Sequence, residues 1–272
     1  MHVEGRGLPL LVIPGIQGRW EWMRPGVRAL ARWRRVITYS LAGDREDVLP
    51  SDATCFDDLV RQALNAMTRA GAARAAVCGV SYGALVAARL AARYPDRISA
   101  LILSSPLPPD FAPDARIERL IASPRLMAPA FMAGAPLRTL PEVRRARPDD
   151  WPRCAAGMLG TVLRRPQSPT RMAARVRLLA GEDFIADARR IICPTLVMTG
   201  DDELDVVVPP ARSRRYLSLV PGAVGARLSG TGHFGMVTRP TEFARLVANF
   251  LESTEGGDSA RRPEQTAGDS RD

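Results

Sequence analysis

Short runs of apolar and β-branched residues alternate with segments of helical periodicity along most of the chain. The runs cover 8–13, 35–40, 75–80, 100–103 and 194–199, and most of them stop at a glycine, a proline or a serine. Strands without a polar face are typical of a parallel sheet that is covered by helices on both sides. The pattern therefore predicts a buried, mostly parallel sheet.

Helical segments separate these predicted strands. Over 55–70, apolar residues such as Leu59 and Met67 repeat at helical spacing while charged residues turn outward. An alanine-rich segment, 84–94, ends before Pro95, where a helix normally stops. Alternating strands and helices form βαβ units with right-handed crossovers. We therefore expect an α/β fold whose mostly parallel central sheet carries helices on both faces.

The alternation breaks over residues 106–190. Prolines recur there, no β-like run is found, and the remaining pieces resemble short helices rich in Met, Leu, Ala and Arg. We expect this segment to be a helical cap inserted into a core that comprises 1–105 and 191–252. The polar residues 253–272 have almost no apolar side chains to bury, so a disordered tail is expected.

One five-residue motif carries the clearest chemical signal. Gly79-Val80-Ser81-Tyr82-Gly83 follows an apolar strand and precedes the alanine-rich helix. A sharp strand-to-helix turn lifts a serine side chain clear of the backbone, and small flanking residues permit the close approach. The helix N-terminus beneath it favours developing negative charge. A glycine-rich turn with a surface serine is the alternative, but the strand before and the helix after favour Ser81 as a nucleophile.

A serine hydroxyl needs a base to take its proton, and the chain has two histidines. His2 lies at the N-terminus, whereas His233 lies in a glycine-flanked loop after the apolar segment 223–228. We therefore expect His233 to be the general base. The acid that orients it is expected in the loop after Gly200. That loop offers several carboxylates: Asp201, Asp202, Glu203 and Asp205.

Composition excludes other classes of function. The formal net charge is +9, but all 38 basic residues are arginines, spread along the chain without interleaved aromatic residues. This indicates a compositional bias, and we expect no nucleic-acid partner. The four cysteines lack metal-ligand spacing and neither histidine has Cys or His neighbours, so we expect buried or incidental thiols and no metal site.

No segment predicts a membrane or secretory location. No apolar run approaches the roughly 18–20 residues of a membrane-spanning helix, and the N-terminus lacks the basic and apolar regions of a signal peptide. We expect a cytoplasmic protein with a small-molecule substrate, no membrane partner and no cofactor.

The segments found in this order resemble the capped α/β-hydrolase family, over about 8–251. The run 11–18, Leu-Val-Ile-Pro-Gly-Ile-Gln-Gly, is similar to the family's first loop, with Pro14 where a histidine is usual. The order of nucleophile, acid and base also matches. The resemblance implies acyl transfer through an acyl-enzyme on Ser81, with an oxyanion hole made by the backbone N–H groups of Ile16 and Tyr82.

The resemblance leaves two positions for the acid. The family usually places its aspartate three residues after the glycine that ends the strand, which gives Glu203 from Gly200, and four before a proline, which gives Asp205 from Pro209. We favour Asp205, because the downstream sequence fits and the family acid is usually an aspartate. Glu203 is the alternative.

The predicted activity is hydrolysis of a small, fairly apolar carboxylic ester or related acyl compound. Apolar cap residues are candidates to line its pocket: Met127, Phe131, Met132, Trp151 and Met158. The same triad supports cleavage of a C–C bond in a meta-cleavage-type product, or of a lactone, and the sequence does not separate these reactions. A non-catalytic ligand receptor or scaffold on the same fold is the alternative from another class.

Overall fold

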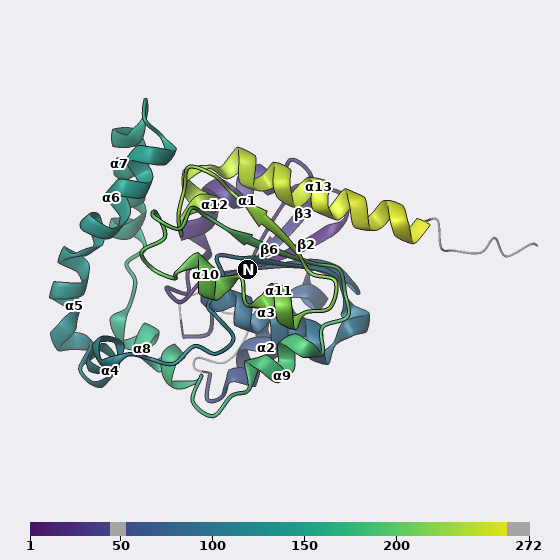
Figure 1. The fold of residues 1–272 in the computed structure, drawn as a ribbon, viewed down its shortest axis with the longest axis horizontal. Coiled ribbons are helices and arrows are strands. Elements are labelled where there is room, and N and C mark those ends of the chain that lie inside the picture. The colour runs from purple at the N-terminus through teal and green to yellow at the C-terminus, as the bar shows by residue number, and fades with distance from the viewer. Residues whose placement is uncertain (44–52, 260–272) are drawn as a thin grey trace, which may run out of the picture.

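The computed structural model describes residues 1–43 and 53–259, which form a seven-stranded sheet with helices on both faces (Figure 1). The strands are ordered β1-β3-β2-β4-β5-β6-β7, and all neighbours are parallel except the pair β1 and β3. The bounds are β1 His2–Glu4, β2 Pro9–Ile13, β3 Arg35–Thr38, β4 Ala75–Val80, β5 Ile98–Ser104, β6 Thr195–Thr199 and β7 Val224–Arg227. The predicted strands are all present, and the predicted fold class is confirmed.

The inner strands of the sheet supply side chains to two apolar cores. In β2, Leu10 and Val12 join one core while Leu11 and Ile13 join the other, because successive side chains point to opposite faces. The first core contains the helices α1 Arg24–Leu30, α12 Gly235–Thr238 and α13 Pro240–Ser259; the second contains α2 Phe56–Arg69, α3 Tyr82–Arg93, α9 Phe184–Arg189 and α11 Tyr216–Leu219. Shorter elements complete the core: η1 Trp20–Met23, η2 Pro95–Arg97 and α10 Pro210–Ser213.

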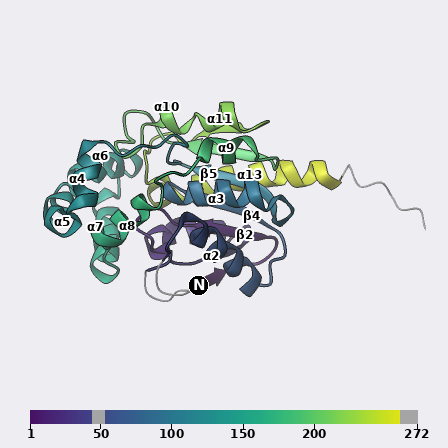
Figure 2. The ribbon, with the colours of Figure 1, turned by 90° about the horizontal axis from the view of Figure 1, so that it is seen from below.

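A group of helices between β5 and β6 stands apart from the sheet. Figures 1 and 2 show these helices together beyond one end of the sheet. We call them the helical insert: α4 Ala115–Ala122, α5 Pro124–Ala133, α6 Ala135–Ala146, α7 Trp151–Arg164 and α8 Pro169–Arg177. Asp114 begins the insert by accepting hydrogen bonds from the first backbone N–H groups of α4, as N-cap residues do. The sequence boundaries of core and cap remain a prediction.

Helix α9 falls within the segment predicted as cap, yet it packs on core helix α3. Arg89 of α3 is buried, and its Nε donates to Asp187 of α9 at 2.6 Å. The Arg89 guanidinium also lies 4.8 Å from the ring centres of Phe56 and Phe184. A buried guanidinium needs such partners, so the last helix before β6 is drawn into the core layer.

The C-terminal helix is longer than the sequence predicted. Disorder was expected from residue 253, but α13 continues to Ser259, and Glu255 accepts a hydrogen bond from Arg34 at 2.6 Å. That ion pair supplies a tertiary contact for an otherwise polar turn. Residues 260–272 of the predicted tail lie outside the described residues. Within the described part, no helix has both the length and the apolar character to cross a membrane.

Candidate active site

Ser81 lies at the turn between β4 and α3, in a backbone conformation that few residues with side chains adopt. Its φ is 54° and its ψ is −116°, in the left-handed half of the map where glycine is favoured. A Cβ on Gly79 would come within 2.5 Å of the Gly83 carbonyl oxygen, and one on Gly83 within 2.4 Å of the Pro14 oxygen. The predicted sharp turn is therefore present, and both glycines are required for it.

The loop after β2 lies directly against this turn. A Cβ built on Gly15 would be 3.5 Å from the Ser81 Cβ and 3.4 Å from the Val80 carbonyl oxygen. Tyr82 is the first residue of α3, so its N–H has no acceptor within the helix. Among the described residues, the Ile16 N–H has no hydrogen-bond partner either. Both N–H groups predicted to form the oxyanion hole therefore lack a backbone acceptor in the described residues, and their role stays a prediction.

His233 and Asp205 come together across two loops. His233 Nδ1 lies 3.1 Å from Asp205 Oδ2, and both side chains are almost fully buried. The other carboxylate oxygen of Asp205 accepts from the backbone N–H groups of Val207 and Val208, which fixes its orientation. Gly232 lets the loops approach, since a Cβ there would meet the Leu204 carbonyl oxygen at 2.4 Å. With Nδ1 engaged, Nε2 on the far side of the ring can exchange a proton.

The other acidic candidates point elsewhere. Glu203 is exposed. Asp202 pairs with Arg214 at 3.0 Å, and Asp201 accepts from the Gly230 N–H at 2.7 Å. Of the two acids left open by the sequence, Asp205 is the one within hydrogen-bonding distance of His233.

Replacing Asp205 with asparagine is expected to lower kcat by about 10³- to 10⁴-fold, because the amide holds the imidazole in the wrong tautomer. Glu203→Gln, the matched control, is expected to change kcat by no more than about twofold, since an exposed carboxylate interacts weakly with distant groups. Steady-state ester hydrolysis by the two variants checks this. A larger loss in Glu203→Gln would reverse the assignment of the acid.

Ser81 and His233 line one cavity of about 480 Å³ between the core and helix α7. Its wall is partly apolar, through Trp22, Met23, Met158, Phe234, Met236 and Val237, and partly basic, through Arg24, Arg28, Arg147, Arg153 and Arg164. Of the predicted apolar residues whose side chains the structure describes, Met158 lines this wall and Met127 and Trp151 do not. Trp151 instead contacts the Arg144 guanidinium, and the side chains of Phe131 and Met132 lie outside the described part.

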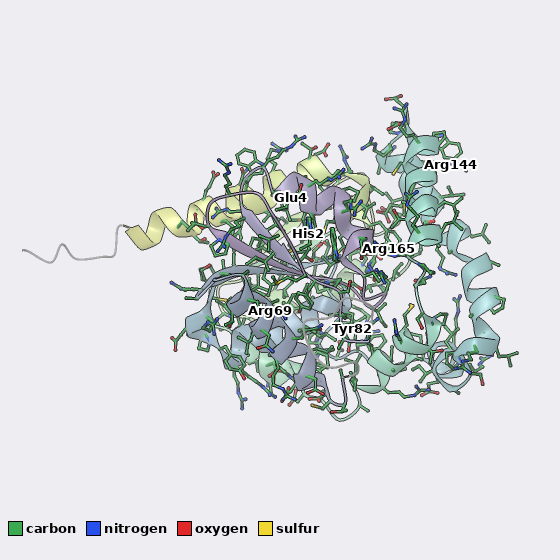
Figure 3. All side chains as sticks on the ribbon, turned by 180° about the vertical axis from the view of Figure 1, so that it is seen from behind. His2, Glu4, Arg69, Tyr82, Arg144 and Arg165 are labelled. Carbon is green, nitrogen blue, oxygen red and sulfur yellow. The ribbon has the colours of Figure 1, made fainter. Side chains whose placement is uncertain are left out.

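Contacts between η1 and Arg165, the residue that follows α7, join the insert to the core beside the cavity. The indole N–H of Trp22 donates to the Arg165 carbonyl oxygen at 2.9 Å, and Arg165 Nε lies 3.0 Å from Glu21. Figure 3 shows Arg165 where the insert meets the core, with Arg144 farther out on the insert. The active-site cavity is therefore bounded by the insert as well as by the sheet.

Two buried side chains of the insert contact the site, and sequence reasoning missed both. Glu142 of α6 accepts hydrogen bonds from the Thr231 hydroxyl at 2.6 Å and from the Phe234 N–H at 2.9 Å, on either side of His233. Burial raises the pKa of its carboxyl, against the hydrogen bond from Thr231, those from the loop backbone and the charge of His233. Glu142 does not lie in a motif. The one signal in the sequence was an acidic residue between hydrophobic positions of an amphipathic helix.

Arg175 of α8 is the second missed residue. Its Nη1 donates to the Ile16 carbonyl oxygen at 2.8 Å, and its Nη2 donates to the Ala42 oxygen at 3.1 Å. The Tyr82 hydroxyl donates to the Arg175 carbonyl oxygen at 3.0 Å. Arg175 therefore contacts both residues predicted to form the oxyanion hole. In a chain with 38 basic residues, nothing local distinguishes this arginine.

Of the four cysteines, Cys154 alone is among the residues that line the cavity. The structure has four free thiols, of which Cys78 and Cys193 are buried. Burial raises the pKa of Cys78 to about 12. Cys154 lines the cavity, and burial raises its pKa as well. Within the described residues, no three His, Cys, Asp or Glu side chains gather as metal ligands would.

Comparison with known proteins places the chain in one family. Residues 10–246 match the "Alpha/beta hydrolase family". The chain is 31% identical over 263 residues to "Polyketide synthase ThaQ" of Burkholderia thailandensis, covering 92% of this chain but only 12% of that protein. It is 28% identical over 258 residues to "Putative carbamate hydrolase RutD" of Enterobacter cloacae, covering 91% of this chain and 92% of that one.

A solved structure gives the same result for the fold. The enol-lactonase from Burkholderia xenovorans LB400 superposes with a TM-score of 0.76 at 22% sequence identity, covering 92% of this chain and 95% of that chain. At this identity the likeness concerns the fold. Because the family match extends over most of the sequence, the chain belongs to the alpha/beta hydrolase family and is a hydrolase.

Proposed function

We propose that this protein is a serine hydrolase that cleaves a small carboxylic ester or a related acyl compound through an acyl-enzyme on Ser81. The observation that carries the proposal is the pairing of His233 with Asp205 at 3.1 Å, on the wall of the cavity that also contains Ser81. A buried carboxylate on Nδ1 orients the imidazole and stabilises its protonated form.

In the proposed first half-reaction, the Ser81 oxygen attacks the substrate carbonyl carbon while His233 Nε2 takes the hydroxyl proton. The negative charge on the carbonyl oxygen is held by the N–H groups of Ile16 and Tyr82, which lie beside the Ser81 turn. The protonated imidazole then donates to the leaving oxygen, and the bond between the carbonyl carbon and that oxygen breaks. An alcohol leaves, and the acyl group stays on Ser81.

In the second half-reaction, His233 takes a proton from water as the water oxygen attacks the acyl carbon. The same N–H groups stabilise the second tetrahedral intermediate. Its collapse returns the proton to the Ser81 oxygen and releases a carboxylic acid. Water alone is consumed, so this chemistry asks for no cofactor.

A cavity of about 480 Å³ favours small acyl groups. We expect p-nitrophenyl esters with acyl chains of about two to six carbons to be hydrolysed best, and chains beyond about ten carbons at least tenfold less well, because longer chains extend past the enclosed volume. The measurement is kcat/KM across a chain-length series, with Ser81→Ala protein as the blank.

The same series separates the related reactions. A lactone and a meta-cleavage-type C–C substrate, assayed beside the esters, show whether a neighbouring chemistry is faster. Turnover of none of these compounds by the folded protein would contradict the acyl-hydrolase proposal.

A further inference from the structure

We propose that the helical insert is part of the catalytic apparatus, with Glu142 as a positioning residue for His233 and Arg175 as a positioning residue for the oxyanion hole. The inference rests on the proposed function for its catalytic meaning. Its structural basis is that two separate helices of the insert, α6 and α8, each place one charged side chain on a different catalytic loop.

Glu142 holds the loop of the base from both ends. One carboxylate oxygen, Oε1, accepts from the Thr231 hydroxyl at 2.6 Å and from the Phe234 N–H at 2.9 Å, and the Thr238 hydroxyl lies 3.3 Å from it. The Thr231 and Thr238 hydroxyls also lie 2.6 Å apart, so the residues on both sides of His233 share one acceptor. On its other face the loop packs against the Asp205 segment, where Gly232 leaves no space for a side chain. The loop that carries His233 is therefore held by an acid of the insert, while an acid of the core holds the imidazole.

Arg175 holds the other catalytic loop, the one after β2 that contains Ile16. By donating to the Ile16 carbonyl, Arg175 Nη1 holds the peptide that follows Ile16, in the loop that Gly15 brings against the Ser81 turn. The Tyr82 hydroxyl reaches back to the Arg175 carbonyl, so the side chain of the second oxyanion residue is tied to the same helix turn. A misplaced oxyanion donor costs rate because its effect depends on its distance from the developing charge.

The burial of both side chains makes these contacts hard to break. Glu142 is 1% exposed and Arg175 is 3% exposed. Lifting the insert would leave a carboxylate, a guanidinium and several loop donors without partners in a dry interface, which is strongly unfavourable. We therefore expect the base of the insert to stay in place through turnover, unlike a lid that opens for each substrate.

The test for Glu142 compares three substitutions in otherwise intact protein. Glu142→Ala is expected to lower kcat by about 10- to 100-fold with KM within about threefold, because a displaced base slows chemistry more than binding. Glu142→Gln keeps an oxygen acceptor in place and should recover most of the lost turnover. Thr231→Val, which removes one donor and preserves shape, should lose several-fold in kcat. The control is Glu118→Ala, an exposed carboxylate of α4.

A double-mutant cycle shows whether Glu142 acts through His233. Glu142→Ala and Asp205→Asn disturb the same imidazole, so the combined loss should be smaller than the product of the single losses. Arg175→Ala, with exposed Arg125→Ala as its control, should also lower kcat by about 10- to 100-fold. Its loss should multiply with that of Asp205→Asn, since the two act on different groups. If the kcat losses of Glu142→Ala and Asp205→Asn multiply in the double variant, Glu142 does not position His233.

Amide hydrogen exchange gives a readout that needs no turnover. Glu142→Ala should speed exchange in 229–238 and leave 14–18 unchanged, whereas Arg175→Ala should do the reverse. If the two variants change hydrogen exchange in these segments but the wild-type protein hydrolyses none of the substrates, the proposed function is wrong and the positioning of the loops by Glu142 and Arg175 is supported. If the wild type is active but folded variants keep its kcat and its exchange pattern, the positioning inference is wrong.

Discussion

Ser81→Ala is expected to lower kcat by at least about 10⁴-fold while the protein stays folded, because the acyl-enzyme then has no oxygen on which to form. Alanine can take the same backbone conformation and differs by one oxygen at a site lining the cavity. Ester hydrolysis under saturating substrate measures the loss, and thermal unfolding by circular dichroism checks the fold. Retention of near wild-type turnover would show that another residue is the nucleophile.

A companion variant, Ser81→Gly, tests whether the turn stores strain. At φ 54° and ψ −116°, a residue with a Cβ costs on the order of 1–3 kcal/mol, and glycine avoids most of that cost. We expect Ser81→Gly to be as inactive as Ser81→Ala but to unfold at a higher temperature. A lower melting temperature for the glycine variant would mean that the turn is unstrained.

His233→Ala is expected to be the second variant with a very large effect, a loss in kcat of about 10⁴-fold or more. Without the imidazole the Ser81 hydroxyl stays protonated, and the leaving group has no proton donor. Because base and nucleophile act as one unit, adding Ser81→Ala to His233→Ala should cost little more than either change alone. The measurement is again kcat for a p-nitrophenyl ester.

The chain's other histidine provides a matched control. His2 stacks on Trp20 with ring centres 4.3 Å apart and lies 3.0 Å from Glu4, and it is not among the residues that line the cavity. His2→Ala is expected to change kcat by no more than about threefold, as substitutions outside the site usually do. Equal losses in the two variants would argue that histidine removal acts through folding.

Much of the fold could be predicted because its signals are local. The apolar runs became strands since a sheet covered on both faces needs side chains such as Leu10 and Leu11 in opposite cores. The Ser81 turn was equally predictable, because its geometry excludes any residue larger than glycine at Gly79 and Gly83. In both cases the residues that carry the signal are close together in the sequence, although Gly83 also makes room for the Pro14 carbonyl oxygen.

The features that escaped prediction depend on contacts between distant segments. Glu142 meets the His233 loop about 90 positions away in sequence, and Arg175 meets Ile16 across 159 positions. No periodicity or spacing marks such pairs. Counting from flanking residues likewise left Asp205 and Glu203 open, and the burial of one and exposure of the other separate them. Helix α9 joined the core for the same kind of reason, through Arg89.

Covalent labelling with a fluorophosphonate probe tests the assignment of an activated serine most directly, and it also separates an enzyme from a ligand receptor on this fold. The reagent reacts with a serine hydroxyl that a base has activated, and mass spectrometry of the digested protein locates the adduct. We expect one adduct, on the peptide containing Ser81, formed at least about 100-fold more slowly in folded His233→Ala protein. An unlabelled wild type, an adduct elsewhere, or equal labelling of the His233 variant would contradict a Ser81–His233 catalytic pair.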